Sequence, residues 1–241
     1  MLRSLDALEK GFLKAREKSQ EECSAELETM RQLIFQIKPI VSTFIHPAPK
    51  PLKKFNSLVY WNWLNFVRNC GYTLYLTNNG LYRNAYGNMR YILESIVQAL
   101  YIDSRHPQTT IETKIHILSE VEHNQSYYFK SLIQKLDIGE KEKIKAIHSS
   151  LSKKIHPTVK TVKSIFEDYL NKDKMPTIIS CNAIKDISIF LRAVIDVFLF
   201  LCIPYFSEHK EQLKSINQMT EYVKKYKLSL TSKTLKIKLL R

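Results

Sequence analysis

The spacing of apolar residues predicts helices along nearly the whole chain. Apolar residues recur every three to four positions with charged residues between them, which is typical of amphipathic helices. The first helix should be long and should end near Pro39, because proline interrupts helical hydrogen bonding. The short break Asn78-Asn79-Gly80 favours a helical hairpin. We therefore predict an all-α protein, built as an antiparallel helical bundle.

The last residues change their period. Apolar and polar residues alternate over 226–230 and again over 235–239, on either side of a short polar break. Alternation with period two is typical of strands, so a small C-terminal β-hairpin is one interpretation. A flexible basic tail is the other, because an isolated hairpin is only marginally stable. The predicted domains are a long N-terminal helical arm over 1–45, a helical bundle domain over 55–225, and the basic tail or β-hairpin over 226–241.

The most apolar stretch, residues 187–206, comes close to the length of a membrane span. Arg192 and Asp196 interrupt it at positions i and i+4, so the two side chains can pair on one helix face. We favour a buried core helix for this stretch. We therefore expect no integral membrane insertion.

Charge and cysteine content narrow the function classes. The net charge of +14 favours an anionic partner, such as nucleic acid or an anionic membrane surface, although a lysine-rich surface that only keeps the chain soluble explains it equally well. With 5 Gly and no glycine-rich phosphate loop, the sequence argues against a nucleotide-binding α/β domain. The 4 Cys form no C-x-x-C pair, so we expect reduced thiols, a cytoplasmic location, and neither a cofactor nor a bound metal.

A polar pair lies within the helix expected at about 81–104. Arg90 and Glu94 are one helical turn apart in an otherwise apolar stretch, so they should lie near the core. Burying an unpaired charge costs on the order of several kcal/mol. The two side chains must therefore pair with each other, or Arg90 must hold a ligand such as a phosphate.

A second polar feature is the end of the basic helix before Pro157. His156 terminates that helix, where the dipole favours a protonated imidazole, and Ser152 lies one turn earlier on the same face. A histidine near an arginine suits metal-independent RNA cleavage, which needs only proton transfer and charge stabilisation. The alternative is structural: His-Pro ends a helix, and Arg–Glu fastens two helices. The surrounding lysines are the best candidates for phosphate binding, namely Lys145, Lys153, Lys154, Lys160 and Lys163.

Aromatic residues are concentrated over 55–77. Interleaved with Lys54 and Arg68, these rings could stack on unpaired bases. We favour a place in the core of the bundle for them. They are Phe55, Tyr60, Trp61, Trp63, Phe66, Tyr72 and Tyr75.

The segment M-R-Y-I-L-E-S-I-V-Q-A-L-Y, followed later by L-S-K-K-I-H-P-T, resembles helical proteins within or near the HEPN superfamily. Those proteins show an R-x-x-x-E helix and a later L-S-x-x-x-H-P motif, and the match covers about residues 55–205. The resemblance implies an antiparallel helical bundle, frequently a homodimer, and an RNase or RNA-binding role in toxin–antitoxin or phage-defence systems. Catalytic HEPN proteins carry Arg and His close together on one helix. Here Arg90 and His156 could meet only through tertiary packing.

These observations predict a HEPN-like protein that interacts with nucleic acid, with RNA favoured over DNA, and that acts as a metal-independent ribonuclease of a defence or toxin module. Arg90 would neutralise phosphate, Glu94 would orient Arg90, and His156, beside Ser152, would transfer protons. A homodimer and an antitoxin or other protein partner are expected. The alternative is a non-enzymatic helical adaptor or oligomerisation protein. A third reading is a peripheral membrane protein that uses the basic tail.

Overall fold

The computed structural model describes residues 5–45, 55–123, 128–156, 181–206 and 213–239. These residues form ten helices and no strand, which confirms the all-α class. The helices are α1 (Leu5–Glu22), α2 (Ser24–Ile45), α4 (Leu58–Asn78), α5 (Tyr82–Arg105), α6 (Ile111–His123), α7 (Phe129–Lys135), α8 (Lys141–Ile155), α10 (Cys181–Phe206), α11 (Leu213–Tyr226) and α12 (Ser229–Leu239).

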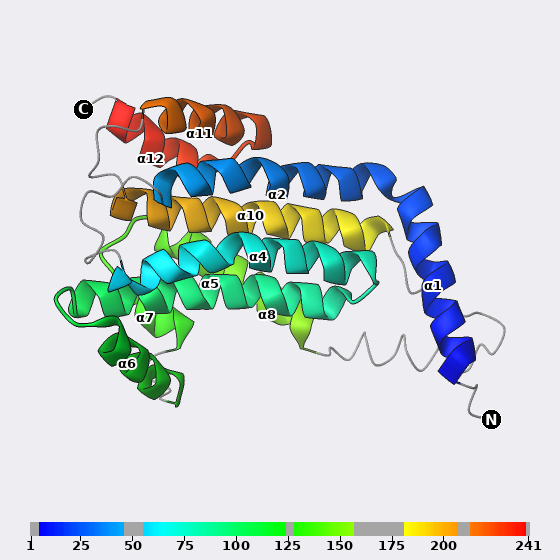
Figure 1. The fold of residues 1–241 in the computed structure, drawn as a ribbon, viewed down its shortest axis with the longest axis horizontal. Coiled ribbons are helices and arrows are strands. Elements are labelled where there is room, and N and C mark those ends of the chain that lie inside the picture. The colour runs from blue at the N-terminus through cyan, green and yellow to red at the C-terminus, as the bar shows by residue number, and fades with distance from the viewer. Residues whose placement is uncertain (1–4, 46–54, 124–127, 157–180, 207–212, 240–241) are drawn as a thin grey trace.

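Four long helices, α2, α4, α5 and α10, surround the main core (Figure 1). The chain turns back after α4 at Gly80, whose φ of 72° is a left-handed conformation that glycine adopts without a steric penalty. As a result α5 packs along α4. Helices α2 and α10, by contrast, run in the same direction (Figure 1). The predicted antiparallel arrangement is therefore wrong for this pair.

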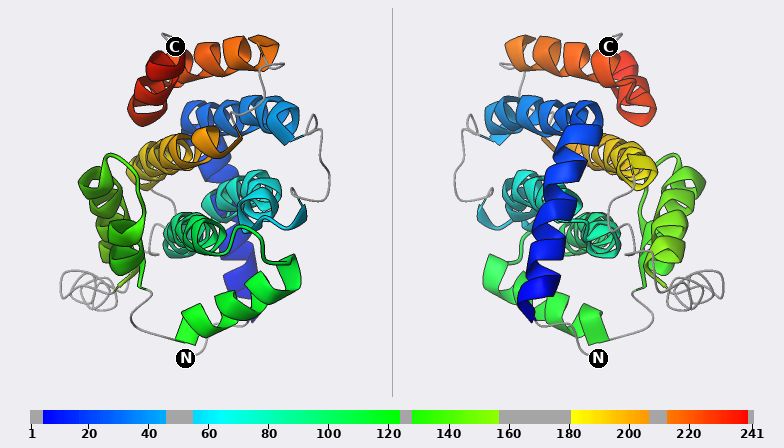
Figure 2. Two further views of the ribbon diagram at one scale, coloured as in Figure 1. Left: turned by 90° about the vertical axis from the view of Figure 1, so that its left-hand side faces the viewer. Right: turned by 90° about the vertical axis from the view of Figure 1, so that its right-hand side faces the viewer.

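The remaining helices cover this core from two sides. The end-on views in Figure 2 show α11 and α12 lying over α2 and α10, on the side away from α5. Helix α8 packs against α5 and α10, while α7 also contacts α5 and α8. The contact between α5 and α8 is the one that assembles the polar cluster described below.

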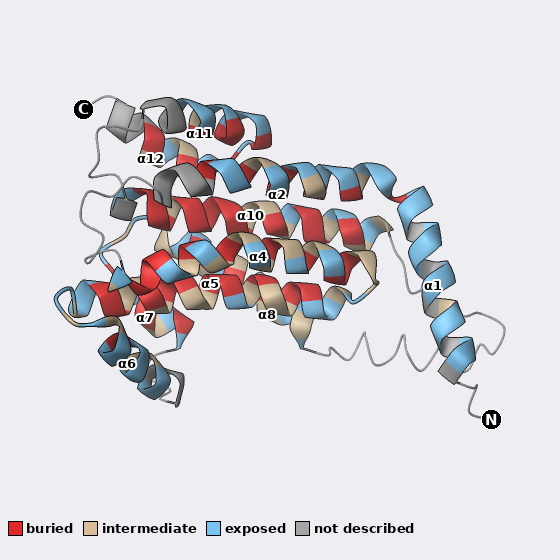
Figure 3. Cartoon of the chain, in the orientation of Figure 1, coloured by how far each residue is buried: buried red, intermediate tan, exposed pale blue. Residues whose placement is uncertain are grey.

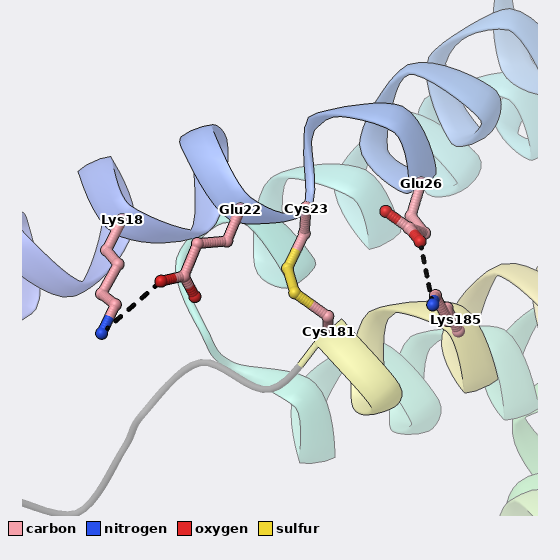
Figure 4. Close-up of a disulfide and its surroundings, with 6 residues drawn as sticks. All are labelled: Lys18, Glu22, Cys23, Glu26, Cys181 and Lys185. Atoms are coloured by element: carbon pink, nitrogen blue, oxygen red, sulfur yellow. Dashed lines mark ion pairs between the residues drawn. A yellow bond between two sulfur atoms is a disulfide. The ribbon is translucent and has the colours of Figure 1, made fainter.

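A disulfide bond joins the beginnings of α2 and α10 (Figure 4). Cys23, at the break between α1 and α2, is bonded to Cys181, and their Cα atoms lie 5.5 Å apart. Glu26 and Lys185 form an ion pair at 3.2 Å close to this bond. The expectation of reduced thiols is wrong for these two cysteines. The two cysteines are 158 residues apart in the sequence, so no local motif predicts that they form a disulfide.

The first 45 residues form two helices of different character. Helix α1 exposes most of its described side chains and extends away from the bundle at the disulfide end (Figures 1 and 3). Helix α2 continues through Pro39, because its apolar stripe remains buried as far as Ile40. The described residues of this segment thus form two helices rather than one, and α2 is a core helix, while the division into a 1–45 arm, a 55–225 bundle and a 226–241 tail stays a prediction.

The C-terminal residues form helix α12, so the predicted β-hairpin is wrong. Asp196 of α10 caps this helix: its carboxylate accepts hydrogen bonds from the backbone N–H groups of Leu230 and Thr231, both at 2.9 Å, and from the Thr231 hydroxyl at 2.8 Å. The apparent period of two arises because residues 226–230 span the end of α11, a turn at Lys227 with φ of 53°, and the start of α12. Asp196 thus fixes α12 onto the core.

A second buried carboxylate fixes the start of α4. The Asp103 carboxylate accepts hydrogen bonds from the Ser57 hydroxyl at 2.7 Å and from the Val59 N–H at 3.0 Å. Lys114 Nζ lies 2.8 Å from the same carboxylate and also donates to the carbonyl of Asn56 at 2.7 Å. The side chains of Lys114 and Asp103 are only 3% and 1% exposed, so this is a buried ion pair with several compensating hydrogen bonds.

Helix α10 contains the apolar stretch identified in the sequence. Among the described helices, Cys181–Pro204 is long and apolar enough to cross a membrane by length and composition alone. In this fold 67% of its most apolar stretch is buried inside the described structure. The absence of integral membrane insertion stays a prediction.

Candidate functional site: an Arg–Glu–His cluster between α5 and α8

Helices α5 and α8 bring Arg90, Glu94 and His148 into direct contact. Nε of Arg90 lies 2.7 Å from Oε1 of Glu94, which is the i,i+4 pairing that the sequence spacing indicates. Nε2 of His148 lies 2.8 Å from the same oxygen. One carboxylate therefore holds a guanidinium from its own helix and an imidazole from the neighbouring helix.

His148 occupies a core position on α8. It lies one turn from Ile144 and one turn from Leu151, both of which are buried, so the imidazole shares the helix face that packs against the bundle. The ring of Phe129 stacks on it, with centroids 4.0 Å apart and an angle of 8° between the planes. The stack fixes the plane of the imidazole, and the hydrogen bond to Glu94 fixes its rotation.

The ionisation of Glu94 sets the tautomer of His148. Burial tends to raise the pKa of the Glu94 carboxyl, but the hydrogen bonds from His148 and Arg90 outweigh burial and hold this pKa below its usual value. An ionised carboxylate can only accept, so Nε2 of a neutral His148 carries the proton and Nδ1 keeps a lone pair. That Nδ1 is buried and has no hydrogen-bond partner in the described part of the chain. Leaving a buried acceptor unsatisfied costs roughly 1–3 kcal/mol.

Arg90 and Glu94 are similarly accessible, with side chains 31% and 30% exposed, whereas His148 is 9% exposed. Only its Nε donates to Glu94; its two terminal nitrogens donate to no residue within the described ranges. A guanidinium has five N–H donors arranged as a rigid fork that fits a phosphate or carboxylate. The Arg90 head group, oriented by Glu94, thus keeps donors available for an anionic ligand.

The other residues predicted for catalysis lie further along α8. The Ser152 hydroxyl donates to the carbonyl oxygen of His148 at 2.9 Å, so it bonds within its own helix. His156 is exposed at the C-cap of α8, about two turns beyond His148. Among the described contacts, none joins His156 to Arg90 or Glu94. The histidine that meets the Arg–Glu pair is His148.

The predicted phosphate-binding lysines are only partly available. Lys145 pairs with Glu142 at 2.7 Å, and Lys154 pairs with Asp186 at 2.7 Å. Lys153 is exposed and has no carboxylate partner among the described residues. The remaining two predicted positions, Lys160 and Lys163, lie outside the described residues. The described basic surface of α8 is therefore weaker than its lysine count suggests.

Lys154 belongs to a compact contact between α5, α8 and α10. The Tyr86 hydroxyl donates to the Asp186 carboxylate at 2.6 Å, and Lys154 Nζ lies 5.7 Å from the centre of the Tyr86 ring. Burial of the phenol, followed by its hydrogen bond to Asp186, raises the pKa of Tyr86. These contacts engage the Lys154 ammonium group, which makes it a poor general phosphate contact.

Sequence reasoning missed His148 although a signal was present. A histidine at a position where the helical stripe calls for an apolar residue must find a polar partner inside the fold. The stripe of Ile144, Leu151 and Ile155 passes through His148, whereas His156 follows the last helical residue. Position on the buried face was the better guide than proximity to the proline.

Within the described ranges, no group of three or more His, Cys, Asp or Glu side chains is placed to hold a metal ion. Comparison of the chain with protein-family models, curated proteins and solved structures found no match.

Proposed function

We propose that this chain is a HEPN-like RNA-interacting protein and that its Arg90–Glu94–His148 cluster is a metal-independent ribonuclease centre. The observation that supports the proposal is the shared carboxylate oxygen of Glu94, which lies within 2.8 Å of both a guanidinium and an imidazole from different helices. Such an arrangement places a charge stabiliser beside a group that can transfer protons. A homodimer, a cytoplasmic location and a role in a defence or toxin module belong to the same proposal.

In this mechanism the terminal nitrogens of Arg90 bind the scissile phosphate and stabilise the negative charge that develops on its oxygens. Nδ1 of His148 takes the proton from the 2′-hydroxyl, which attacks the adjacent phosphorus. The 5′-oxygen takes a proton from solvent water and leaves as an alcohol, and a 2′,3′-cyclic phosphate remains. Glu94 holds the imidazole in the required tautomer and stabilises the imidazolium that forms, as a carboxylate partner does in other histidine-based centres.

One structural consequence follows from the burial of Nδ1. Because this atom is covered in the described fold, RNA binding must open the contacts around His148 before proton transfer can occur. Hydrogen bonds in ligand-free active sites often tighten or rearrange only when substrate is bound.

The proposal is tested with end-labelled single-stranded RNA in the presence of EDTA. We expect endonucleolytic cleavage with 2′,3′-cyclic phosphate ends, and an Arg90→Ala variant slower by about 100- to 1000-fold. Arg90→Lys should restore little activity, because an ammonium group lacks the fork geometry. Intact RNA together with no salt-sensitive RNA binding would reject the proposal.

The non-enzymatic adaptor remains a second candidate because of helix α1. Within the described ranges, this helix leaves most of its side chains exposed and packs mainly against α2 and α4, so a partner helix could pack along it. Removal of residues 1–22 tests this role. Unchanged assembly with retained RNA binding would argue against the adaptor, whereas loss of assembly with intact RNA activity would support it as a separate property.

A further inference from the structure

The aromatic residues of α4 divide between two faces of the helix. Trp63 and Phe66 are fully buried and pack against Phe198 of α10. A second set faces solvent at helical spacing, and Figure 3 shows exposed segments recurring along the visible face of α4. We call this set the α4 stripe; its members are Trp61, Leu64, Arg68, Tyr72 and Tyr75. The prediction of a core role holds for only part of the aromatic cluster.

Each end of the α4 stripe carries an ordered aromatic surface. Near the N-terminal end, the indole N–H of Trp61 donates to the carbonyl of Phe55 at 3.0 Å, which fixes the orientation of a ring that is 45% exposed. Near the C-terminal end, the Tyr72 and Tyr75 rings lie nearly parallel, at 10°, with centroids 6.1 Å apart. Rings held in place outside the core bind a flat ligand with little loss of side-chain entropy.

The charge of the α4 stripe favours an anionic ligand. Helix α4 contains no Asp or Glu, and Arg68 lies midway between the two aromatic surfaces. Arg68 makes no hydrogen bond or ion pair with any residue in the described part of the chain. Aromatic faces interleaved with a free guanidinium form the combination that binds single-stranded nucleic acid, where bases stack on rings and phosphates pair with cations.

The same features argue against a second copy of the chain as the occupant. An isologous two-fold contact centred on the α4 stripe, which runs from Trp61 to Tyr75, would place Arg68 of each copy opposite its counterpart. No carboxylate of α4 could neutralise that repulsion. A duplex is also unsuited to the stripe, because its bases are stacked inside and cannot reach exposed rings.

Helix α5, which carries Arg90, also exposes an aromatic residue, Tyr91. Asn88 of α5 faces α4, since its side-chain nitrogen donates to the Asn69 carbonyl at 2.7 Å, whereas Glu94 faces α8. Tyr91 lies between these two directions on the outer surface of α5 and is 53% exposed. It therefore exposes a further aromatic ring on the helix that carries Arg90.

We infer that the α4 stripe is a binding surface for single-stranded RNA, with Trp61 and the Tyr72–Tyr75 pair stacking on bases and Arg68 contacting the phosphate between them. This inference rests on the proposed function for the nature of the ligand. It adds a surface that lies apart from the Arg90 cluster and holds the strand that Arg90 acts on.

Binding is measured with a fluorescein-labelled, 2′-O-methyl oligouridylate of about 12 nucleotides. This probe lacks the free 2′-hydroxyl and so cannot be cleaved by the proposed mechanism. Trp61→Ala and Tyr75→Ala should each weaken binding by about tenfold, and Tyr75→Phe, which keeps the ring, should bind like the wild type. Tyr128→Ala is the matched control, because Tyr128 is 61% exposed but lies at the N-cap of α7, outside the stripe.

Tryptophan fluorescence gives a signal that a merely structural role of Trp61 would not produce. The chain has 2 Trp, and Trp63 is fully buried, so quenching by a stacked base reports on Trp61. Quenching should occur in the wild type and disappear in Trp61→Phe while anisotropy still detects binding. Equal RNA affinity of the stripe variants and the wild type would overturn the inference. It would also be overturned if the stripe variants changed from dimer to monomer while their RNA affinity stayed the same, because the stripe would then be a subunit contact.

The results separate this inference from the proposed function. Wild-type cleavage that stripe variants leave unchanged would reject the α4 surface but retain the ribonuclease. Binding that depends on the stripe, combined with no cleavage of ordinary RNA, would reject the ribonuclease but retain the surface. A wild-type protein that neither binds nor cleaves single-stranded RNA would reject both.

Discussion

Two buried carboxylates of this protein, Asp103 and Asp196, differ from Glu94 in what surrounds them. Asp103 and Asp196 each accept hydrogen bonds from backbone N–H groups at the start of another helix, α4 and α12 respectively. Glu94 accepts no described backbone hydrogen bond and instead holds two cationic or basic side chains. Asp103 and Asp196 thus provide acceptors for the free N–H groups at the start of a helix. Glu94 instead orients two side chains that keep unused donors or lone pairs.

This difference separates groups that maintain the fold from groups that are available for chemistry. A saturated buried ion pair has no capacity left for a ligand, and its removal is felt as lost stability. In the Glu94 cluster, the Arg90 and Glu94 side chains are about one-third exposed and the buried Nδ1 of His148 has no described partner, which is the pattern expected where function overrides local stability. Substitutions at the two kinds of carboxylate should therefore affect different measurements.

The largest effect on stability should come from Lys114→Ala. This change removes the buried ammonium group and leaves the Asp103 carboxylate buried without its cationic partner. The expected loss in the free energy of unfolding is about 3–5 kcal/mol. Denaturant unfolding monitored by circular dichroism measures the loss. Lys153→Ala, an exposed site, is the matched control and should lie within about 0.5 kcal/mol of the wild type. Equal stability of the two variants would show that the Asp103 pair does not fasten α4.

Loss of the disulfide should come next. Replacing both Cys23 and Cys181 by serine frees a loop of 158 residues in the unfolded chain, and we expect a loss of about 2–5 kcal/mol. The wild type treated with a reductant should unfold at the same denaturant concentration as the double variant. A wild type that is insensitive to reductant would contradict the role assigned to this bond. Thiol titration before and after denaturation checks that the bond is present.

Asp196→Ala should destabilise the protein by about 2 kcal/mol, because α12 loses the acceptor for two backbone donors and a buried hydroxyl. Proteolysis should then release the C-terminal residues faster than in the wild type. The Asp196→Asn variant keeps one acceptor oxygen, so its stability should lie between those of the wild type and the alanine variant. Proteolysis at the wild-type rate in the alanine variant would mean that α12 is held by other contacts.

The substitution Glu94→Gln should have the smallest effect on stability. Because its pKa is lower in the folded protein than in the unfolded chain, the unfolded state binds more protons as the solution becomes acidic. The stabilisation is fully present above about pH 5 and is lost as the pH falls through the folded pKa. The wild type should therefore lose more stability on acidification than Glu94→Gln. Parallel pH profiles would contradict the assignment of Glu94 as an ionised partner of Arg90 and His148.

Much of the fold followed from helical periodicity, and the exceptions have physical causes. The Arg90–Glu94 contact could be predicted because both residues lie on one helix at a spacing that places them on one face. The disulfide, the Asp196 cap and the His148 contact each join segments distant in sequence, so only tertiary packing reveals them. The α12 error arose because an alternating pattern crossed a helix boundary and mimicked a strand.

The candidate site illustrates the same limit. The sequence identified the helix that provides the guanidinium, but it favoured the histidine at the end of α8 over the one inside it. His148 belongs to a buried stripe, where an imidazole has to be hydrogen-bonded, and His156 is exposed at the C-cap. Burial, which the sequence encodes only through periodicity, distinguishes the two.

The most direct test compares initial rates of RNA cleavage in EDTA for two single variants, His148→Gln and His156→Gln. Glutamine at position 148 can still donate a hydrogen bond to Glu94 but cannot transfer a proton, so we expect a rate loss of about 100-fold or more with a folded protein. His156→Gln should cleave at the wild-type rate. A wild-type rate for His148→Gln, or a loss confined to His156→Gln, would contradict the assignment of the catalytic centre to the cluster between α5 and α8.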